Sequence, residues 1–248
     1  MITHAPSLVA ERLLAARRDG VAVSWMDVLP ASREDAFAAQ TLQLQSIGPI
    51  GGWKVGAKHA SAEPSCAPLP AGGILSSRAV LQGPAWRMRG IEVELAVRFG
   101  RDLEVYSPPS AEDLRQSLDA VLPAVEVVET RLSDWAGSDS LAQLADLQSH
   151  GALVLGDPQP VPADLDLRTV VAYLAADGQP LASARGGNPA ADLWRMLGWL
   201  AVHCTWQGRP LRAGQVVTTG SCTGMLYVDG GTAVQAELQG VGQVLLQF

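Results

Sequence analysis

The sequence predicts an α+β protein, with a helical N-terminal region followed by mixed β-sheets. Amphipathic helical patterns fill most of residues 1–50, whereas short apolar runs typical of strands dominate residues 51–248. Two or three helices interrupt these strands without a regular alternation of strand and helix. We therefore expect a helical region over residues 1–50 and a β-rich domain over residues 51–248.

Two helices are predicted in the N-terminal region. Residues 7–18 place their leucines and valine near one face, and Gly20 ends the pattern. The second helix begins at Ser32, a favourable N-cap followed by acidic residues in the first turn, and it ends at Gly48.

The chain changes character after residue 50. Residues 51–58 predict a short strand opened by glycines, and residues 62–73 contain too many prolines and glycines for a regular element. Residues 91–99 predict a strand and residues 110–121 a helix capped by a serine. Residues 123–130 predict another strand, with a proline at its start.

The C-terminal half contributes further strands and one long helix. Residues 144–156 begin irregularly and end as a strand, and residues 167–184 predict a hairpin that turns at Asp177-Gly178. Late strands are expected within residues 213–221 and 241–248.

The clearest helix of the sequence lies within residues 186–211. Asn188 is its predicted cap, Pro189 occupies the first helical position, and Gly208 closes it. This helix is rich in tryptophan and leucine, which favours a position in the core or at an interface.

Composition excludes several classes of protein. The net charge is −7 and the pI about 5.0, which argues against binding to nucleic acid. Charged residues make up only 17% of the 248, which predicts an ordered chain with part of its surface covered in a homo-oligomer. Three cysteines without metal-type spacing, and no membrane-spanning apolar run, predict a cytoplasmic protein with reduced thiols.

Both lysines of the chain fall in one short segment. Lys54 and Lys58 lie within the stretch WKVGAK, although arginine supplies all other side-chain cations apart from histidine. A compact, titratable ammonium is therefore a candidate functional group here, with chance clustering as the alternative.

Two glutamates alternate with apolar residues in the strand predicted at 91–99. Glu92 and Glu94 project from the same face, where their charges repel unless a cation lies between them. The alternative is a strand whose polar face meets solvent. Glu126 also lies at the centre of an apolar strand, so the three carboxylates could together hold Mg²⁺ or Mn²⁺. Glu129 is expected on the opposite face from Glu126.

An ordered set of motifs resembles one enzyme family. The stretches GWKVG, IEVELAV, LPAVEVVETR, LADLQSHGALVLG, GNPAADLWRMLGWLA and GRPLRAGQVVTTGS resemble the fumarylacetoacetate hydrolase superfamily. Among its members, the 2-keto-4-pentenoate hydratase and 4-oxalocrotonate decarboxylase branch is the most similar. The resemblance implies a metal-binding catalytic domain over residues 51–248 and a role in the catabolism of aromatic compounds.

The resemblance also implies roles for individual residues. Glu92, Glu94 and Glu126 are implied metal ligands for Mg²⁺ or Mn²⁺, and Lys54 an active-site lysine. The implied substrate contacts come from the turn formed by Thr219, Gly220 and Ser221. Three departures are visible: the G-L-T that relatives carry after the lysine motif is replaced at Gly56-Ala57-Lys58, the segment after Lys58 is short and lacks an aspartate, and the family's ADNAS motif is replaced by residues 145–149.

Three further residues are weighed as participants. Asp146 is a candidate to orient a ligand or Lys54, with a loop turn or cap as the alternative. His59 and His150 are candidates for proton transfer, although an exposed loop histidine is the favoured interpretation of His59.

The expected reaction is hydration of a small 2-oxo acid, a 2-hydroxy-dienoate or a 2-keto-4-enoate, through a metal-stabilised enolate. Decarboxylation of a 4-oxalocrotonate-like diacid and C–C hydrolysis of an acylpyruvate are alternatives. A catalytically degenerate structural partner is the alternative outside the enzymes.

Overall fold

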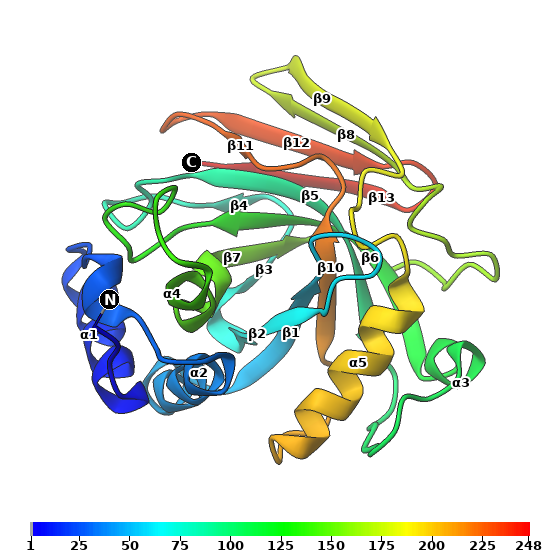
Figure 1. Ribbon diagram of the computed structural model, residues 1–248. Helices are drawn as coiled ribbons and strands as arrows, with labels where there is room; N and C mark the ends of the chain where they lie inside the picture. The colour runs from blue at the N-terminus through cyan, green and yellow to red at the C-terminus, as the bar shows by residue number, and fades with distance from the viewer. Residues whose placement is uncertain (1) are drawn as a thin grey trace.

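Residues 2–248 are described by a computed structural model of the chain (Figure 1). It begins with two helices, α1 (Pro6–Asp19) and α2 (Arg33–Ile47), which pack against each other. The Ser32 hydroxyl accepts a hydrogen bond from the Asp35 amide at 3.1 Å, so α2 begins at its predicted cap. Both predicted N-terminal helices are confirmed.

Most strands form a mixed eight-stranded sheet in the order β2-β1-β10-β5-β6-β7-β3, with β11 paired to β5. The long central strands β5 and β6 are antiparallel, whereas β1 and β10 are parallel. The strands of this sheet are β1 (Ile50–Gly56), β2 (Ser65–Pro70), β3 (Ile74–Ser76), β5 (Gly90–Phe99), β6 (Leu118–Val128), β7 (His150–Leu155), β10 (Val216–Ser221) and β11 (Leu226–Tyr227).

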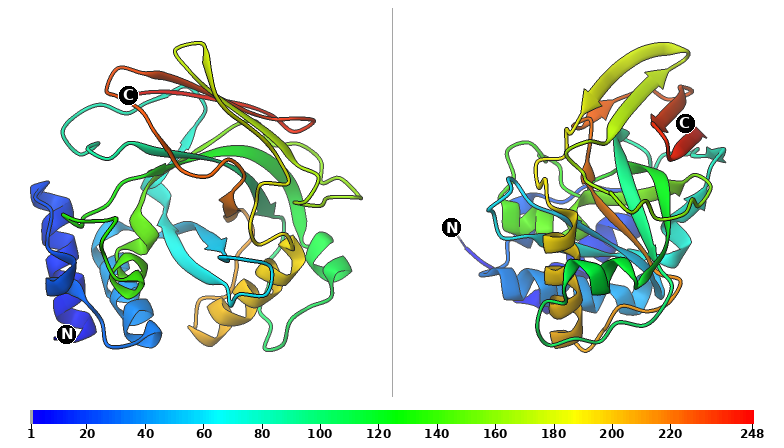
Figure 2. Two further views of the ribbon diagram at one scale, coloured as in Figure 1. Left: turned by 45° about the horizontal axis from the view of Figure 1, so that its top comes forward. Right: turned by 90° about the vertical axis from the view of Figure 1, so that its right-hand side faces the viewer.

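A second sheet of five strands has the order β4-β13-β12-β8-β9 and lies over one side of the larger sheet (Figure 2). The β8–β9 hairpin turns at Asp177 and Gly178, whose φ angles of 48° and 76° fit the predicted two-residue turn. The strands of this sheet are β4 (Ala79–Val80), β8 (Val171–Ala176), β9 (Gln179–Arg185), β12 (Ala233–Leu238) and β13 (Gly242–Gln247).

Shorter helices connect the strands, and one longer helix packs against β1. The remaining helices are α3 (Ala111–Arg115), α4 (Ser140–Ala145), α5 (Leu193–Trp206) and the 3₁₀ turns η1 (Trp25–Val28), η2 (Ala71–Gly73) and η3 (Leu147–Ser149). Within residues 2–248, none of these helices has the length and apolar character needed to cross a bilayer.

The main hydrophobic core joins the two sheets and the N-terminal helices. Alternate residues of a strand face opposite sides, so Val93 of β5 and Val125 of β6 enter this core. Leu13 of α1 and Phe37 of α2 belong to the same core. The helical region and the β-rich region contribute residues to one common core. The division near residue 50 therefore stays a prediction.

The segment 62–73, expected to be a loop, contains strand β2 instead. β2 pairs with β1 at the edge of the large sheet. An edge strand tolerates proline because the missing N–H of each proline can face away from the neighbouring strand. The prolines of this segment therefore mark a sheet edge and not an irregular loop.

The helix predicted over 110–121 is shorter than expected. α3 ends at Arg115, and β6 begins at Leu118, which pairs with Phe99 of β5. Pairing along the full length of β5 overrides the local helical pattern. Pro123 consequently lies inside β6, where its carbonyl accepts from the Gly156 amide just after β7 ends.

The long helix near the C-terminus begins later than predicted. α5 starts at Leu193, and its cap is Asp192, whose side chain accepts from the Arg195 amide. Ala191 has a φ of 58°, which excludes a continuous right-handed helix from Pro189 onward. Asn188 is therefore free for another role. Gly208, with φ 69°, follows the helix end as predicted.

Candidate metal and substrate site

Three carboxylates converge where β5 and β6 lie side by side. Glu92 is paired directly with Glu126 in the antiparallel register, and Glu94 lies two residues along the same face of β5. One carboxylate oxygen from each of the three lies within 4.8 Å of the others. The structure thus brings together the three residues that strand periodicity selected.

Lys54 reaches this cluster from β1. Its Nζ donates to Oε1 of Glu126 at 2.5 Å and to the carbonyl oxygen of Gln148 at 3.1 Å. Burial disfavours the charged ammonium, but the three neighbouring carboxylates outweigh burial and raise the pKa of Lys54 above its ordinary value. In the metal-free protein the lysine therefore carries a positive charge. Lys58, the other lysine, is exposed.

Glu94 is held by the C-terminal end of β10. Its Oε2 accepts hydrogen bonds from the Thr218 hydroxyl and from the Gly220 amide, the latter at 2.9 Å. Burial, followed by the charges of the other two carboxylates, raises the pKa of Glu94 to about 8. The metal-free cluster thus holds more negative charge than its surroundings readily support.

Glu126 is fully buried and has two basic neighbours. Besides Lys54, the ring Nδ1 of His150 lies 3.4 Å from its Oε1. Burial opposes ionisation of Glu126, but Lys54 and His150 together outweigh burial and lower its pKa. Oε2 of Glu126 is buried with no hydrogen-bond partner in the described part of the chain.

The two histidines weighed in the sequence separate clearly. His59 is exposed and lies 3.1 Å from the Ser61 hydroxyl. His150 is buried at the start of β7, and burial lowers its pKa. The strand pattern alone could not select His150, because its contact with Glu126 depends on the pairing of β6 with β7.

The predicted substrate turn is the C-terminal end of β10, where the register with β5 shifts between Thr218 and Ser221. Its residues have two different roles. The Thr219 hydroxyl donates to the carbonyl of Leu95 at 2.7 Å, so this side chain supports the turn from the sheet side. Gly220 and Ser221 line a cavity, and the Ser221 hydroxyl is buried with no hydrogen-bond partner among residues 2–248.

Asn188 supports the same turn, a role that the sequence analysis did not predict. Its Nδ2 donates to the carbonyls of Thr219 and Gly220 at 2.8 and 2.9 Å. The signal that could have found it is the GNP stretch, which was interpreted as a helix cap. The buried side chain instead ties the segment before α5 to the C-terminal end of β10.

Asp146 lies behind the site and not in it. Its Oδ2 accepts from the Thr130 hydroxyl and the Arg131 amide, each at 3.0 Å, and its Oδ1 accepts from the Arg131 guanidinium. The hydrogen bonds of Lys54 go elsewhere. The structure therefore places Asp146 in a buried ion pair with Arg131.

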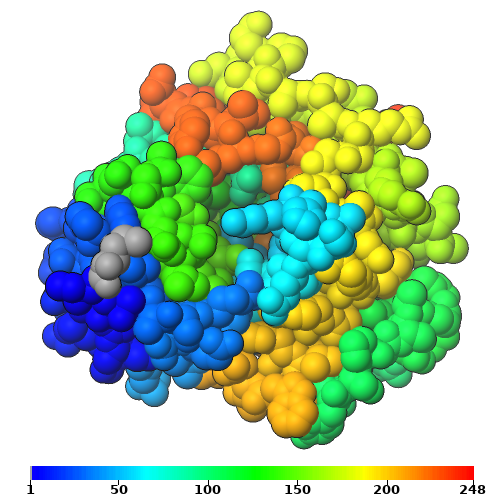
Figure 3. Space-filling view, in the orientation of Figure 1, coloured from blue at the N-terminus to red at the C-terminus, as the bar shows by residue number. Residues whose placement is uncertain are grey.

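A cavity of about 690 Å³ opens beside the acidic cluster. Its walls come from α2, the segment after β1, the α4–η3 region and the C-terminal end of β10. Figure 3 shows the opening between the segment after β1, in cyan, and the α4 region, in green. Glu92 is the carboxylate of the cluster that lines this cavity.

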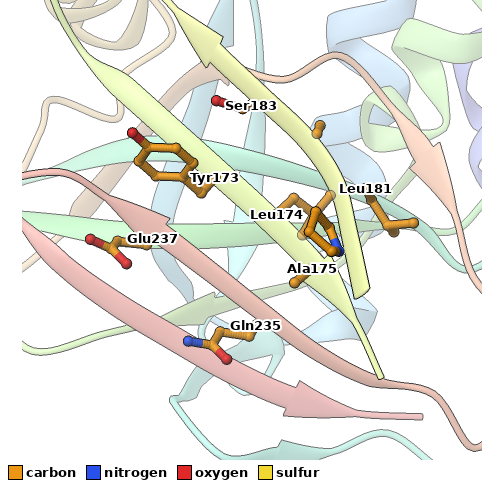
Figure 4. Close-up of a pocket in the computed structure, with 9 residues that line it drawn as sticks. Tyr173, Leu174, Ala175, Leu181, Ser183, Gln235 and Glu237 are labelled. Atoms are coloured by element: carbon orange, nitrogen blue, oxygen red, sulfur yellow. The ribbon is translucent and has the colours of Figure 1, made fainter. Parts of the chain in front are cut away.

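A second hollow lies on the smaller sheet, across β8, β9 and β12 (Figure 4). Its volume is about 390 Å³, and Glu237 is the carboxylate among the residues that line it. Tyr173 and Leu181 leave 42% and 43% of their surfaces exposed here. This hollow holds no group of titratable side chains comparable to the acidic cluster.

A model of the C-terminal domain of fumarylacetoacetate (FAA) hydrolase matches residues 37–247. The chain belongs to the fumarylacetoacetate hydrolase family. The 2-keto-4-pentenoate hydratase of Paraburkholderia xenovorans (strain LB400) is 34% identical over 158 residues, 64% of this chain and 58% of that protein. The 2-hydroxyhexa-2,4-dienoate hydratase of Comamonas testosteroni is 29% identical over 157 residues, 63% of this chain and 59% of its own length.

Solved structures agree in fold. The 4-oxalocrotonate decarboxylase from Pseudomonas putida G7, complexed with magnesium and adipate, superposes with a TM-score of 0.84 at 22% identity. The superposition covers 97% of this chain and 95% of that one. The predicted architecture is therefore confirmed, including the N-terminal helices.

Proposed function

We propose that this chain is a divalent-metal-dependent lyase that hydrates 2-hydroxy-dienoate or 2-keto-4-enoate acids. The observation that carries the proposal is the meeting of three carboxylates and one lysine ammonium beside a cavity. Family membership and the hydratase names of two relatives support the same reaction class.

The acidic cluster fits a hard dication. Glu92, Glu94 and Glu126 offer converging oxygens, and the unpartnered Oε2 of Glu126 needs a cation or a donor. One ammonium cannot balance three carboxylates. We assign the three as ligands of Mg²⁺ or Mn²⁺. Such an ion supplies a Lewis acid for the carboxylate and 2-oxo oxygens of a substrate.

Lys54 is the proposed catalytic cation. Two of its three N–H donors are used by Glu126 and Gln148, which leaves one to face a substrate oxygen. From that position the ammonium stabilises negative charge on the 2-oxygen and can move a proton to or from it.

The C-terminal end of β10 is the proposed contact for the substrate. Ser221 presents a hydroxyl without a partner in the described chain, and Gly220 exposes backbone to the cavity. Thr219 acts indirectly, because its hydroxyl is bonded to the sheet. Asn188 keeps the turn in place through two hydrogen bonds.

The test is turnover of 2-hydroxypenta-2,4-dienoate by the purified chain with Mg²⁺, with Mn²⁺ and with EDTA. We expect loss of dienoate absorbance with either metal, no CO₂ release, and no reaction in EDTA. Glu92→Gln should reduce turnover by more than the roughly 100-fold that loss of a supporting residue costs. Glu237→Gln, in the second hollow, is the matched control and should leave turnover unchanged.

Other outcomes identify the other reactions. CO₂ release from 4-oxalocrotonate would make the chain a decarboxylase, and pyruvate release from acetylpyruvate would make it a C–C hydrolase. Metal binding without turnover of any of the three compounds would identify a degenerate structural partner. Full activity in EDTA would refute the proposed metal dependence.

Self-association is a further part of the proposal. The thinly charged surface and the exposed Tyr173 and Leu181 on the smaller sheet favour a homo-oligomer. Light scattering on the purified chain tests this directly. A mass equal to one 26.1 kDa chain would refute it.

A further inference from the structure

A short left-handed turn lies between α4 and β7. Leu147, Gln148 and Ser149 have φ angles of 51°, 51° and 58°, and none of them is glycine. Residues with a Cβ adopt this region singly and rarely, because the Cβ comes too close to the following carbonyl. Three in succession persist only when the surrounding structure enforces them.

Arg131 binds both ends of this turn. Its Nη2 donates to the carbonyl of Asp146 at 2.7 Å, just before the turn, and its Nη1 donates to the carbonyl of His150 at 2.9 Å, just after it. The Asp146 carboxylate in turn accepts from the guanidinium and from Thr130. Arg131 and Asp146 are 5% and 0% exposed, so water does not compete for these bonds.

The middle of the turn faces the candidate site. The Gln148 carbonyl accepts the Lys54 ammonium at 3.1 Å, and the Gln148 side chain donates to the Ser65 hydroxyl at 2.6 Å. His150, which ends the turn, lies against Glu126. The conformation of the turn therefore fixes where the ammonium of Lys54 is held.

We infer that the buried Arg131–Asp146 pair is a positioning unit that holds the Leu147–Ser149 turn and, through the Gln148 carbonyl, aims Lys54 at the reacting oxygen. Its effect on catalysis depends on the proposed function, whereas its effect on Lys54 does not. The competing interpretation is a pair that only packs the region, since buried ion pairs often add little beyond local order.

Selective lysine modification tests the inference without a substrate. The chain has two lysines, and exposed Lys58 is an internal standard for the partly buried Lys54. We expect Asp146→Asn to raise the acylation rate of Lys54 relative to Lys58 by about tenfold, because the loosened turn no longer offers the Gln148 carbonyl to the amine. The control is Asp119→Asn, which breaks the exposed ion pair between Asp119 of β6 and Arg98 of β5. It should leave the ratio of Lys54 to Lys58 acylation unchanged.

Kinetics add a second measurement that a merely structural role would not move. In folded Asp146→Asn we expect kcat to fall about 10- to 100-fold while KM and the Mn²⁺ affinity stay near those of the parent. Activity that falls only in proportion to the folded fraction, or an unchanged Lys54 to Lys58 ratio, would overturn the inference. Failure of the unmodified protein to bind Mn²⁺ would overturn the proposed function instead. The ratio of Lys54 to Lys58 acylation could still be measured in that case.

A glycine substitution tests the role of the turn itself. Glycine adopts the left-handed region freely, so Gln148→Gly should partly rescue Asp146→Asn. Gln148→Ala loses the same Ser65 contact but keeps a Cβ. Combined with Asp146→Asn, it should show no rescue. Equal kcat values for the two double variants would overturn the inference.

A milder substitution guards against loss of folding. Thr130→Val removes the hydrogen bond to the Asp146 carboxylate, and the acceptor of the Leu132 amide, with little change of shape. It should raise the Lys54 to Lys58 ratio in the same direction, by less than Asp146→Asn. No change in this folded variant would overturn the inference if Asp146→Asn proves insoluble.

Discussion

Replacing Glu94 by glutamine should make the metal-free protein more stable and abolish metal binding at the same time. Glu94 is 2% exposed, and both its burial and the charges of the neighbouring carboxylates disfavour its charged form. Glutamine has nearly the same shape, and its carbonyl oxygen can still accept from the Thr218 hydroxyl and the Gly220 amide. The substitution therefore removes a charge without opening a cavity.

The size of the effect follows from the raised pKa of Glu94. A carboxyl with a pKa of about 8 when folded and 4.5 when unfolded binds more protons in the folded state throughout that interval. Stability of the metal-free protein consequently falls as the pH rises from about 5 to 8. The loss is at most about 5 kcal/mol, at about 1.4 kcal/mol for each tenfold change in proton affinity.

The assay is thermal unfolding in EDTA between pH 5 and 8. Glu94→Gln should gain on the parent as the pH rises, by about 2–4 °C of Tm for each kcal/mol in a chain of this size. Added Mn²⁺ should raise the Tm of the parent most at pH 8, where the ion displaces fewest protons, and should not affect the variant.

Two results would refute this reasoning. A variant less stable than the parent at pH 8 in EDTA would show that Glu94 is not held against its tendency to take up a proton. An equal Mn²⁺-induced rise in Tm for both proteins would show that Glu94 is not a ligand.

The remaining predictions concern other residues of the site and the thiols. Lys54→Met should keep Mn²⁺ binding by calorimetry and lose about 10²- to 10⁴-fold in kcat, and an active variant would contradict its catalytic role. Asn188→Ala should cost about 1–3 kcal/mol in urea unfolding, because two buried carbonyls lose their donor, and should raise KM. Burial raises the pKa of Cys222 to about 12 and that of Cys66 above its usual range. Ellman's reagent should therefore label neither thiol until the protein unfolds, and rapid labelling of the native protein would be inconsistent with this burial.

The acidic cluster could be predicted because it depends on strand periodicity. Glu92 and Glu94 share a face by their spacing alone, and a glutamate within an apolar strand, as at Glu126, signals a partner. Capping chemistry and glycine stops likewise predicted the two N-terminal helices and the β8–β9 turn. The shared face of Glu92 and Glu94, the helices and the turn are local features that the sequence nearly determines, whereas the approach of Glu126 depends on the pairing of β5 with β6.

Features that depend on contacts between residues far apart in the chain were not predicted from the sequence. The proline-rich β2 is a strand because it pairs with β1. The residues after Arg115, predicted to be helical, instead form β6 and pair with β5. Asn188 looked like a cap because its partners, two carbonyls at the C-terminal end of β10, are 31 and 32 residues away. Asp146 belongs to a buried pair that no spacing rule reveals.

The most direct measurement is a crystal structure of the protein grown with Mn²⁺, with the ion located by its anomalous scattering. The metal assignment predicts one strong peak per chain at about 2.0–2.2 Å from a carboxylate oxygen of Glu92, Glu94 and Glu126. A peak elsewhere, or none at this cluster in Mn²⁺-saturated crystals, would contradict the assignment of these residues as a metal centre.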